Sequence, residues 1–180
     1  LAPGGPEGGL PVRILDPKRA LEARGYVDRD EFGDFSAGPA ILRIAASLRG
    51  GTMLDRLAVI AQPHLDQLAA QTGESTYLAV SDGRTGTYIA TAESPRAIRH
   101  VGWIGQDVDL DGSALGAALE TPGVTVTRTG AIEADITALS RALPPNGKLG
   151  LAVSIVGPEH RFTDDARTRH AVAISATVDA

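Results

Sequence analysis

Cysteine is absent from this chain of 180 residues, and aromatic residues make up only 4% of it. Without cysteine the chain can form no disulfide, no thiolate metal site and no cysteine nucleophile. Because aromatic side chains are scarce, Ala, Val, Ile and Leu must fill the interior. No apolar run approaches the roughly 18 residues that a membrane-spanning helix needs. The first residues also lack the basic-then-apolar order of a signal peptide. We therefore expect a globular cytoplasmic protein with no membrane partner.

The charge balance argues against a chain that coats nucleic acid without specificity. The formal net charge is −5. Residues 1–50 carry seven basic and seven acidic side chains, whereas residues 51–180 carry ten and fifteen. The acidic excess therefore lies in the second part of the chain, and a local DNA contact in the first part stays compatible with the charge.

Residues 1–11 are rich in Gly and Pro and are expected to form a loop or a disordered segment, a Gly/Pro-rich entry to the chain. Signals for a helix and a hairpin follow. Asp16 suits the N-cap, Pro17 the first helical position and Gly25 the position just past the last turn, so a helix is predicted over 16–24. The next stretch, 26–37, reads as two short strands around a tight turn.

Two longer helices are predicted next, over residues 38–50 and 52–73, because apolar residues recur at helical spacing in both. Pro63 lies inside the second helix and is expected to kink or interrupt it. Gly73 is expected to end it.

From Ser75 the apolar period changes from helical spacing to two, which predicts an antiparallel sheet. A hairpin is expected over 75–94, followed by further strands at 98–105, 123–130 and 148–157, the last of them central. Short helices are expected at 111–120, with Ser113 as N-cap, and at 134–143, followed by an edge. A final helix is expected from Thr163, with Asp164 and Asp165 in its first turn and Ala166, His170, Ile174 and Val178 facing inward. This order of elements predicts an α+β fold, an antiparallel sheet flanked by helices.

Catalytic and metal-binding signals are missing from the pattern of residues. The four histidines, at positions 64, 100, 160 and 170, are dispersed and form no pair at i, i+4 spacing. The stretch 107–112, "DVDLDG", superficially resembles a calcium loop but is not followed by the bidentate glutamate that such a loop requires. No G-x-S-x-G or phosphate-binding glycine loop is present. We expect no enzymatic activity and no cofactor.

Two positions have the chemistry to bind a small anion. The start of the short helix at 113–118 offers backbone N–H groups beside small residues. Arg141 carries a guanidinium that can bind a carboxylate if the side chain points inward. If the side chain points outward, it indicates no binding role. An ordinary capped helix and a solvated arginine explain the same residues, so both readings stay open.

Read together, four segments resemble the IclR-type bacterial transcriptional regulators. They are "ALEARGYVDRDEFGDFSAGPAILRIAAS", "PHLDQLAAQTGESTYLAVSDGRTGTYIATAES", "VGWIGQDVDLDGSALGAAL" and "LAVSIVGPEHRFTDD". The third is similar to the family's G-x-x-x-P-L…A-x-G-K-A segment, but has Asp109 in place of Pro and Ala117 in place of Lys. The resemblance covers most of the chain from about Ala20.

The resemblance implies a winged helix-turn-helix (residues 1–38, incomplete), a linker helix (39–52) and a GAF-like effector-binding domain (53–180). It is incomplete because the turn expected before the recognition helix has no room between Leu15 and Ala20. Either the DNA-binding unit is degenerate or residues are missing from the sequence at this point.

The resemblance also implies two sets of site residues. The DNA-contacting residues would be Lys18, Arg19, Arg24 and Arg29. The effector-binding residues would be Gly112, Ser113, Ala114, Leu115, Gly116, Arg141, Ser154, Val156, Glu133 and Asp135. The partners would be a double-stranded DNA operator, a small organic or aromatic acid, and further copies of the chain in a homodimer or homotetramer. A small-molecule sensor that acts through protein partners without DNA is the alternative.

Overall fold

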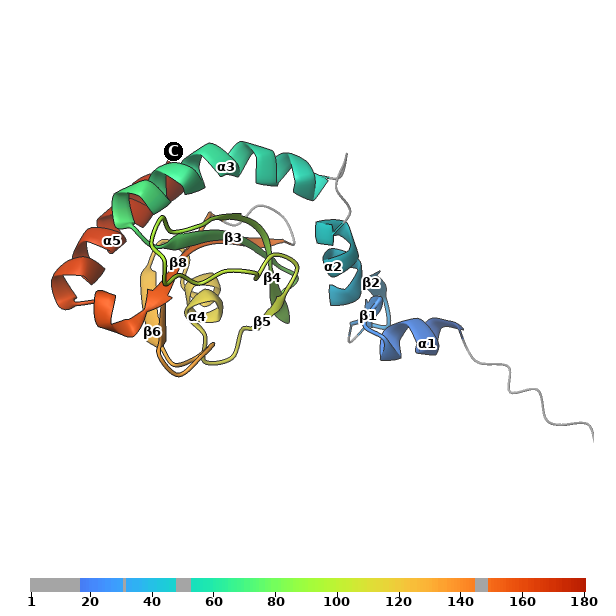
Figure 1. Ribbon diagram of the computed structural model, residues 1–180. Coiled ribbons are helices and arrows are strands. Elements are labelled where there is room, and N and C mark those ends of the chain that lie inside the picture. The colour runs from blue at the N-terminus through green and yellow to red at the C-terminus, as the bar shows by residue number, and fades with distance from the viewer. Residues whose placement is uncertain (1–16, 31, 48–52, 145–148) are drawn as a thin grey trace, which may run out of the picture.

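The computed structural model describes residues 17–30, 32–47, 53–144 and 149–180, and it has an α+β fold (Figure 1). The expected antiparallel sheet flanked by helices is confirmed. The sequence-based expectations for the Gly/Pro-rich entry and the Asp16 cap, and the parts of predicted elements that fall on residues 31, 48–52 and 148, lie outside the described residues.

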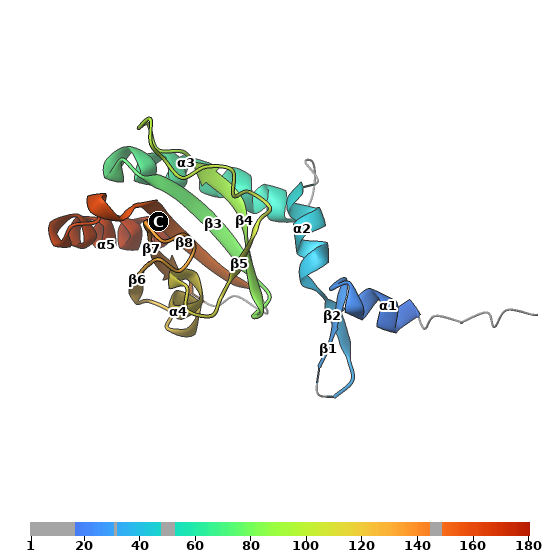
Figure 2. The ribbon, with the colours of Figure 1, turned by 60° about the horizontal axis from the view of Figure 1, so that its bottom comes forward.

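The N-terminal part is a short helix, a two-stranded hairpin and a second helix, which project away from the rest of the chain (Figure 2). Their bounds are α1 Pro17–Ala23, β1 Val27–Arg29, β2 Phe35–Ala37 and α2 Pro39–Ser47. Gly25 follows α1 with a φ of +69°, a conformation that favours glycine at the end of a helix. A side chain at Gly38 would meet the carbonyl oxygen of Gly25, so α2 can begin directly against the end of α1.

Helix α3 runs without interruption over Met53–Thr72, although it contains Pro63. Of the two effects expected of Pro63, a kink or an interruption, the interruption does not occur. A proline removes one N–H donor and leaves the carbonyl four residues earlier without its partner. Pro63 and Val59, which carries that carbonyl, are both exposed, so water can satisfy the freed group. Gly73 ends the helix as predicted, with a φ of +72°.

The C-terminal part is built on one six-stranded antiparallel sheet in the order β5-β4-β3-β8-β7-β6. The strand bounds are β3 Ser75–Ser81, β4 Thr85–Ala92, β5 Asp107–Asp109, β6 Thr125–Thr129, β7 Ile136–Ala142 and β8 Gly150–Pro158. Strand β8 is central, as predicted, and pairs with β3 on one side and β7 on the other.

Each face of the sheet has its own apolar core. Helices α3 and α5 (Asp164–Val178) cover one face (Figure 1), where Leu68, Ile155 and Ile174 are fully buried. Helix α4 (Ala114–Glu120) covers the opposite face, which we call the α4 face, with Leu115 and Tyr77 in its core. Thr163 caps α5 and its predicted inward residues are buried or half-buried, as expected.

Two predicted elements are wrong. The strand expected over 98–105 is not formed, apart from an isolated bridge at Ile104, and the edge strand β5 lies further along the chain. Gly102 and Gly105 both have positive φ, which breaks an extended run at two points. The helix expected over 134–143 is instead strand β7, which lies between β6 and β8. Alternation of small and larger residues in β7 suits a strand buried on both faces.

A buried ion pair joins Glu74, just before β3, to the short helix that follows β8. The Arg161 guanidinium, in the short 3-10 helix Glu159–Arg161, donates to the Glu74 carboxylate at 2.6 Å. The two side chains are 12% and 2% exposed, respectively. Burial raises the pKa of Glu74, while the hydrogen bond and charge of Arg161 act in the opposite direction.

Candidate functional site

Helix α4 begins at a tightly built turn. The Ser113 hydroxyl accepts a hydrogen bond from the backbone N–H of Gly116 at 3.0 Å, which confirms Ser113 as the N-cap. A Cβ on Gly116 would lie 1.9 Å from the carbonyl oxygen of Leu110, so only glycine allows this approach. The close contact fixes α4 against the segment that precedes it.

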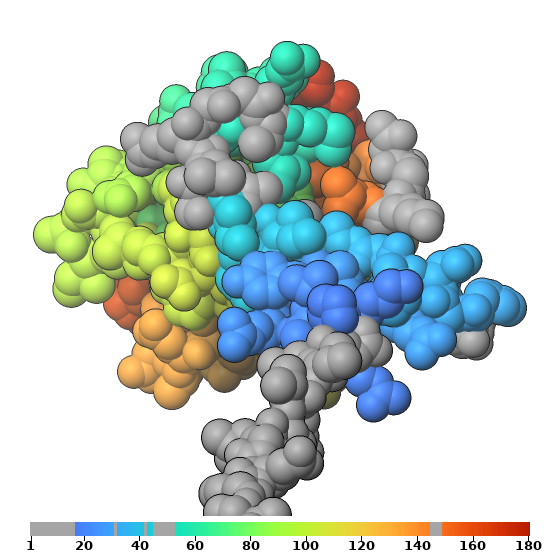
Figure 3. Space-filling model, turned by 90° about the vertical axis from the view of Figure 1, so that its right-hand side faces the viewer, coloured from blue at the N-terminus to red at the C-terminus, as the bar shows by residue number. Residues whose placement is uncertain are grey.

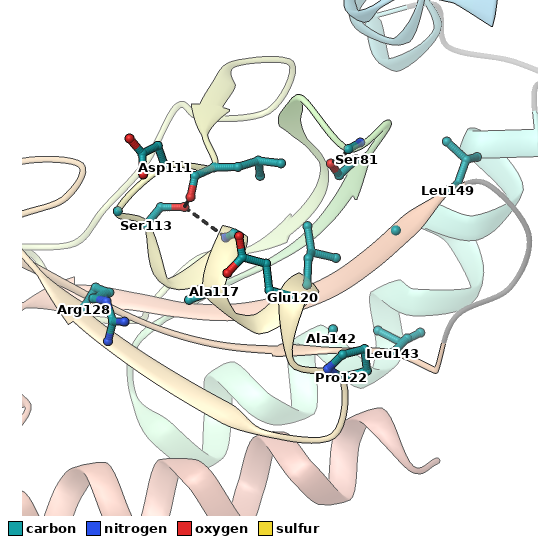
Figure 4. Close-up of a pocket in the computed structure, with 16 residues that line it drawn as sticks. Ser81, Asp111, Ser113, Ala117, Glu120, Pro122, Arg128, Ala142, Leu143 and Leu149 are labelled. Atoms are coloured by element: carbon teal, nitrogen blue, oxygen red, sulfur yellow. Dashed lines mark hydrogen bonds between the residues drawn. The ribbon is translucent and has the colours of Figure 1, made fainter. Parts of the chain in front are cut away.

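A groove of about 590 Å³ opens beside α4 (Figure 4). Its volume is in the range of small-molecule sites. In Figure 4, the N-cap Ser113 and Ala117 and Glu120 of α4 line one side, and Ser81 and Leu149 lie across from them. The charged side chains that line it are Asp111, Glu120 and Arg128. Two carboxylates against one guanidinium make the groove unfavourable for an anion.

A cluster of rings, which we call the ring cluster, lies on the same face of the sheet, with three rings buried and that of Trp103 partly buried. Its members are Tyr77 of β3, Tyr88 of β4, and His100 and Trp103 of the connection before β5. The rings of Tyr77 and Tyr88 are 4.6 Å apart, and those of His100 and Trp103 are stacked at 5.0 Å. Burial raises the pKa of Tyr77 to about 12 and also raises that of Tyr88, so both phenols stay protonated.

Two serines on adjacent strands lie on the same face as the ring cluster. The hydroxyls of Ser140 in β7 and Ser154 in β8 are 2.8 Å apart, and both residues are fully buried. Val156 packs in the same core. These hydroxyls and rings give the α4 face a polar interior, which is uncommon for the middle of a sheet.

The structure places the predicted effector residues in separate groups. Gly112, Ser113 and Gly116 line the groove, while Ala114 and Leu115 are buried beneath it. Ser154 and Val156 lie in the core beside the ring cluster. Their role in effector binding stays a prediction.

Arg141, Glu133 and Asp135 lie away from the groove. Arg141 lines a different cavity, of about 240 Å³, with Val178 of α5, so its side chain does not face α4. It therefore gives no support to an acidic effector on the α4 face. Glu133 and Asp135 are exposed in the connection before β7, and the charge of Glu133 acts on His100.

The predicted DNA-contacting residues are all exposed in the N-terminal part. The Lys18 ammonium lies 5.4 Å from the centre of the Phe35 ring, and the Arg29 guanidinium lies 5.8 Å from it. Phe35 thus brings the helix and the hairpin together. Arg19 and Arg24 lie on α1 and directly after it.

Two ion pairs connect the N-terminal part with the sheet domain. Arg84 in the β3–β4 turn contacts Asp28 of β1 at 2.5 Å, and Arg43 of α2 contacts Asp107 of β5. Figure 3 shows the N-terminal part, in blue, lying in front of the sheet domain. Strand β5 directly follows the segment that carries His100 and Trp103, and Val108, next to Asp107 in this strand, packs in the core of the α4 face.

No group of histidine, aspartate and glutamate side chains suited to a metal ion occurs among the described residues. Within the same part of the chain, no helix has both the length and the hydropathy to cross a bilayer.

The ring cluster was not predicted from the sequence. Its members come from residues 77 to 103, and the expected strand over 98–105 would have turned alternate side chains in and out. The pairing of Tyr77 with His100 depends on how the connection folds back over β3. The period of two in the hairpin predicted over 75–94, which contains both tyrosines, was the one signal that pointed to this face.

Comparisons with known proteins agree on one family. The model of the C-terminal part of bacterial IclR transcriptional regulators matches residues 52–142, about half of the chain. XynR, an HTH-type transcriptional regulator of Escherichia coli K12, is 28% identical over 102 residues, which are 56% of this chain and 39% of that protein.

Solved structures show the same fold. The IclR protein of Thermotoga maritima superposes with a TM-score of 0.62 at 19% identity, over 90% of this chain and 80% of that one. An IclR transcriptional regulator of Alicyclobacillus acidocaldarius gives 0.59 at 19% identity, over 89% and 79%. With the family model matched, the chain belongs to the IclR family of bacterial transcriptional regulators.

Proposed function

We propose that the chain is a ligand-responsive, cytoplasmic transcriptional regulator. Its N-terminal part binds operator DNA, and its sheet domain binds a small organic or aromatic acid. The observation that carries this proposal is the match of the regulator family's model to the sheet domain, together with the exposed helix and hairpin that precede it. The division at residues 1–38, 39–52 and 53–180 is part of the same proposal.

The geometry of α1 and the hairpin supports DNA contact. Lys18 and Arg19 are exposed at the start of α1, and Arg29 is exposed on the hairpin. Helix-turn-helix proteins place such basic residues against phosphates and base edges, with the helix in the major groove. Asp30 and Asp34 lie at the tip of the hairpin, where the Asp30 carboxylate accepts a hydrogen bond from the Asp34 N–H at 2.8 Å. The helix is therefore the better contact surface of the two.

Replacing Arg19 by alanine is expected to weaken operator binding by about tenfold and to lower the salt slope by about one for each lost phosphate contact. Fluorescence anisotropy of a labelled operator duplex at several salt concentrations measures both. Arg169→Ala is the matched control, because Arg169 is an exposed arginine on α5, outside the N-terminal part. Equal losses in the two variants would remove α1 from the contact surface.

Exposed apolar side chains support self-association. Met53, Val59 and Ile60 of α3 are 62%, 74% and 66% exposed, and Ile41 of α2 is 40% exposed. Apolar residues on the outer side of these two helices suit burial against a second copy of the chain. We place the homodimer contact here, and a dimer of this kind would read a roughly palindromic operator.

The ion pair between Arg43 and Asp107 offers a route for coupling effector to DNA. An effector changes operator affinity only by stabilising one arrangement of the N-terminal part over another. Arg43 is on the proposed linker helix, and Asp107 is on the strand that follows the ring cluster. A shift of that segment would move Asp107 relative to Arg43.

Arg43→Glu is expected to change the ratio of operator affinities with and without a bound acid by about two- to fivefold, the contribution of one exposed ion pair. The double variant Arg43→Glu/Asp107→Arg restores the ratio by swapping the charges. Arg169→Glu, which reverses an exposed charge on α5, is the control. If the double variant behaves like the single one, the pair does not transmit the signal.

A sensor that acts through protein partners is the alternative function. It predicts that the full-length protein has no affinity for DNA at any salt concentration, while acid binding to the sheet domain persists. The anisotropy measurement above separates the two functions.

A further inference from the structure

The ring of His100 has an unusual environment inside the ring cluster. It is 6% exposed, and its Nδ1 lies 2.8 Å from the Tyr77 hydroxyl. That hydroxyl also donates to the carbonyl oxygen of His100 at 2.9 Å, where the Ser75 hydroxyl donates as well, at 2.8 Å. Since the Tyr77 hydroxyl has one proton, Nδ1 carries the ring proton and donates to the phenol oxygen while the carbonyl is engaged.

The second ring nitrogen of His100 has no hydrogen-bond partner. Its Nε2 atom is fully shielded from solvent and accepts from no donor among the described residues. A buried polar atom without a partner costs about 1–3 kcal/mol, and among the described residues Nε2 of His100 is the one such side-chain atom that belongs to the ring cluster. The Nε2 lone pair is therefore placed for a group that the protein itself does not supply.

The groups around His100 allow its ring to become a cation. Tyr77 of β3 faces the ring as a neutral phenol, and Trp103 covers it as a neutral indole. The charge that acts on the ring is Glu133, from the connection before β7, which favours the imidazolium form. Burial has the larger and opposite effect and lowers the pKa of His100, so the ring is neutral when nothing is bound.

The other candidate cations on this part of the molecule do not compete. Arg141 lines a cavity with α5 and not the α4 face. Arg128 lines the groove but is exposed, donates to the Thr127 carbonyl at 3.0 Å, and shares the groove with Asp111 and Glu120. A carboxylate buried on the α4 face therefore needs a cation that is created on binding, since an unpaired buried charge is strongly disfavoured.

We propose that Nε2 of His100 is the effector-binding group for the carboxylate of a small organic acid, and that the acid is bound together with one proton. The proton comes from solvent or from the acid itself and forms an Nε2–H bond, so that an imidazolium donates to the carboxylate. This inference rests on the proposed function, because it names the group that would recognise the effector of the sheet domain.

Proton uptake makes acid binding depend on pH with a fixed sign. The free ring has a pKa below its ordinary value, and a paired carboxylate raises that pKa in the complex. Between these two pKa values, affinity tightens as pH falls, by at most about tenfold per pH unit. Above both values the ring stays neutral and affinity no longer depends on its protonation.

The test uses the full-length protein, with Trp103, the single tryptophan among these 180 residues, as the reporter. The probes are glycolate, benzoate and 4-hydroxybenzoate at millimolar concentrations, each with its neutral amide as the matched control. Binding is followed by Trp103 fluorescence at about pH 6 and about pH 8, a range across which histidine titrates. Calorimetry in two buffers of different ionisation enthalpy counts the protons taken up. We expect at least one acid to bind, to bind more tightly at the lower pH with uptake of up to one proton, and to bind more tightly than its amide.

Two variants separate the role of Nε2 from that of the fold. His100→Asn keeps a polar atom near Nδ1 for Tyr77 and removes Nε2, whereas His100→Gln keeps a polar atom near Nε2 that cannot take up a proton. Both are expected to weaken acid binding by about 10- to 100-fold, the effect of one charge-assisted hydrogen bond. His100→Gln is also expected to abolish proton uptake. Thermal unfolding of each variant checks the fold, and proton uptake by the wild-type protein needs no variant.

The proposal is overturned if no probe acid binds, if amides bind as tightly as acids, if affinity does not change with pH, or if both variants bind the acid like the wild type. Acid binding that survives in both variants leaves the proposed regulator intact with its effector elsewhere. Acid binding through His100 by a protein with no affinity for DNA overturns the proposed regulator and keeps this inference.

Discussion

Replacing Arg161 by alanine is expected to lower the free energy of unfolding by about 3–5 kcal/mol, because it leaves the Glu74 carboxylate buried without its cation. Glu74 is 2% exposed and receives the Arg161 guanidinium at 2.6 Å. The loss is measured by urea unfolding at neutral pH. Arg99→Ala is the matched control, since the Arg99–Glu93 pair has 38% and 48% exposed side chains and contributes less than about 1 kcal/mol.

The pH dependence of this loss has a definite sign. The folded-state pKa of Glu74 is raised by burial, so the folded protein holds this proton more tightly than the unfolded chain does. Stability from this group is therefore lost as pH rises through the folded pKa. Removal of Arg161 takes away the two largest effects that lower this pKa, so the deficit of Arg161→Ala is greatest at neutral pH and shrinks toward acidic pH. A deficit that stays constant with pH would contradict the role given to the ion pair.

A second pair of changes tests whether charge or packing is lost. Replacing both partners by apolar residues, as in Glu74→Leu/Arg161→Met, is expected to recover most of the stability, because no buried charge is left unpaired. If the double variant is no more stable than Arg161→Ala, the loss comes from packing and from the bond that Arg161 donates to the Ile98 carbonyl at 3.0 Å.

Gly116→Ala is expected to destabilise the protein by about 1–3 kcal/mol, the typical cost of overpacking a core. In an ordinary helix the same change would stabilise by up to about 1 kcal/mol, because alanine has the higher helix propensity. Here the added Cβ would lie 1.9 Å from the Leu110 carbonyl oxygen, so α4 or the backbone before it must move. Thermal or urea unfolding measures the sign directly.

The control for Gly116→Ala is Ala117→Ser, which adds one atom at the next position of α4, where the side chain is only half-buried. We expect a change within about 0.5 kcal/mol for this surface-type substitution. Stabilisation by Gly116→Ala would mean that α4 does not approach Leu110 as closely as described.

Local signals predicted much of the fold. Gly25 and Gly73 end helices, Ser113 and Thr163 begin them, and each works through one or two neighbouring backbone groups. Such signals can be read from a few consecutive residues. The hairpin after Ser75 was equally clear, because its apolar alternation is long.

Elements whose form depends on distant partners were predicted wrongly. Strand β7 is rich in alanine and was expected to be a helix, but its ladders with β6 and β8 decide its conformation. The segment before β5 was expected to be a strand, but two glycines with positive φ bend it over the α4 face. Pairing across the sheet overrides weak local propensity in both places.

The candidate site was predictable in part for the same reason. The sequence located the groove through the residues around Ser113, since they are contiguous. It did not locate the ring cluster, because the bond between Tyr77 and His100 spans 23 positions. Nor did it fix the direction of Arg141, which depends on a strand that had been expected to be a helix.

The most direct test of the central claim is selection of duplexes from a random DNA pool by the full-length protein, followed by anisotropy titrations of the enriched sequence. We predict a roughly palindromic sequence whose affinity falls steeply with salt and changes when an acid is bound. Failure to enrich any sequence, or binding that ignores both salt and acid, would contradict the account of this protein as a ligand-responsive regulator.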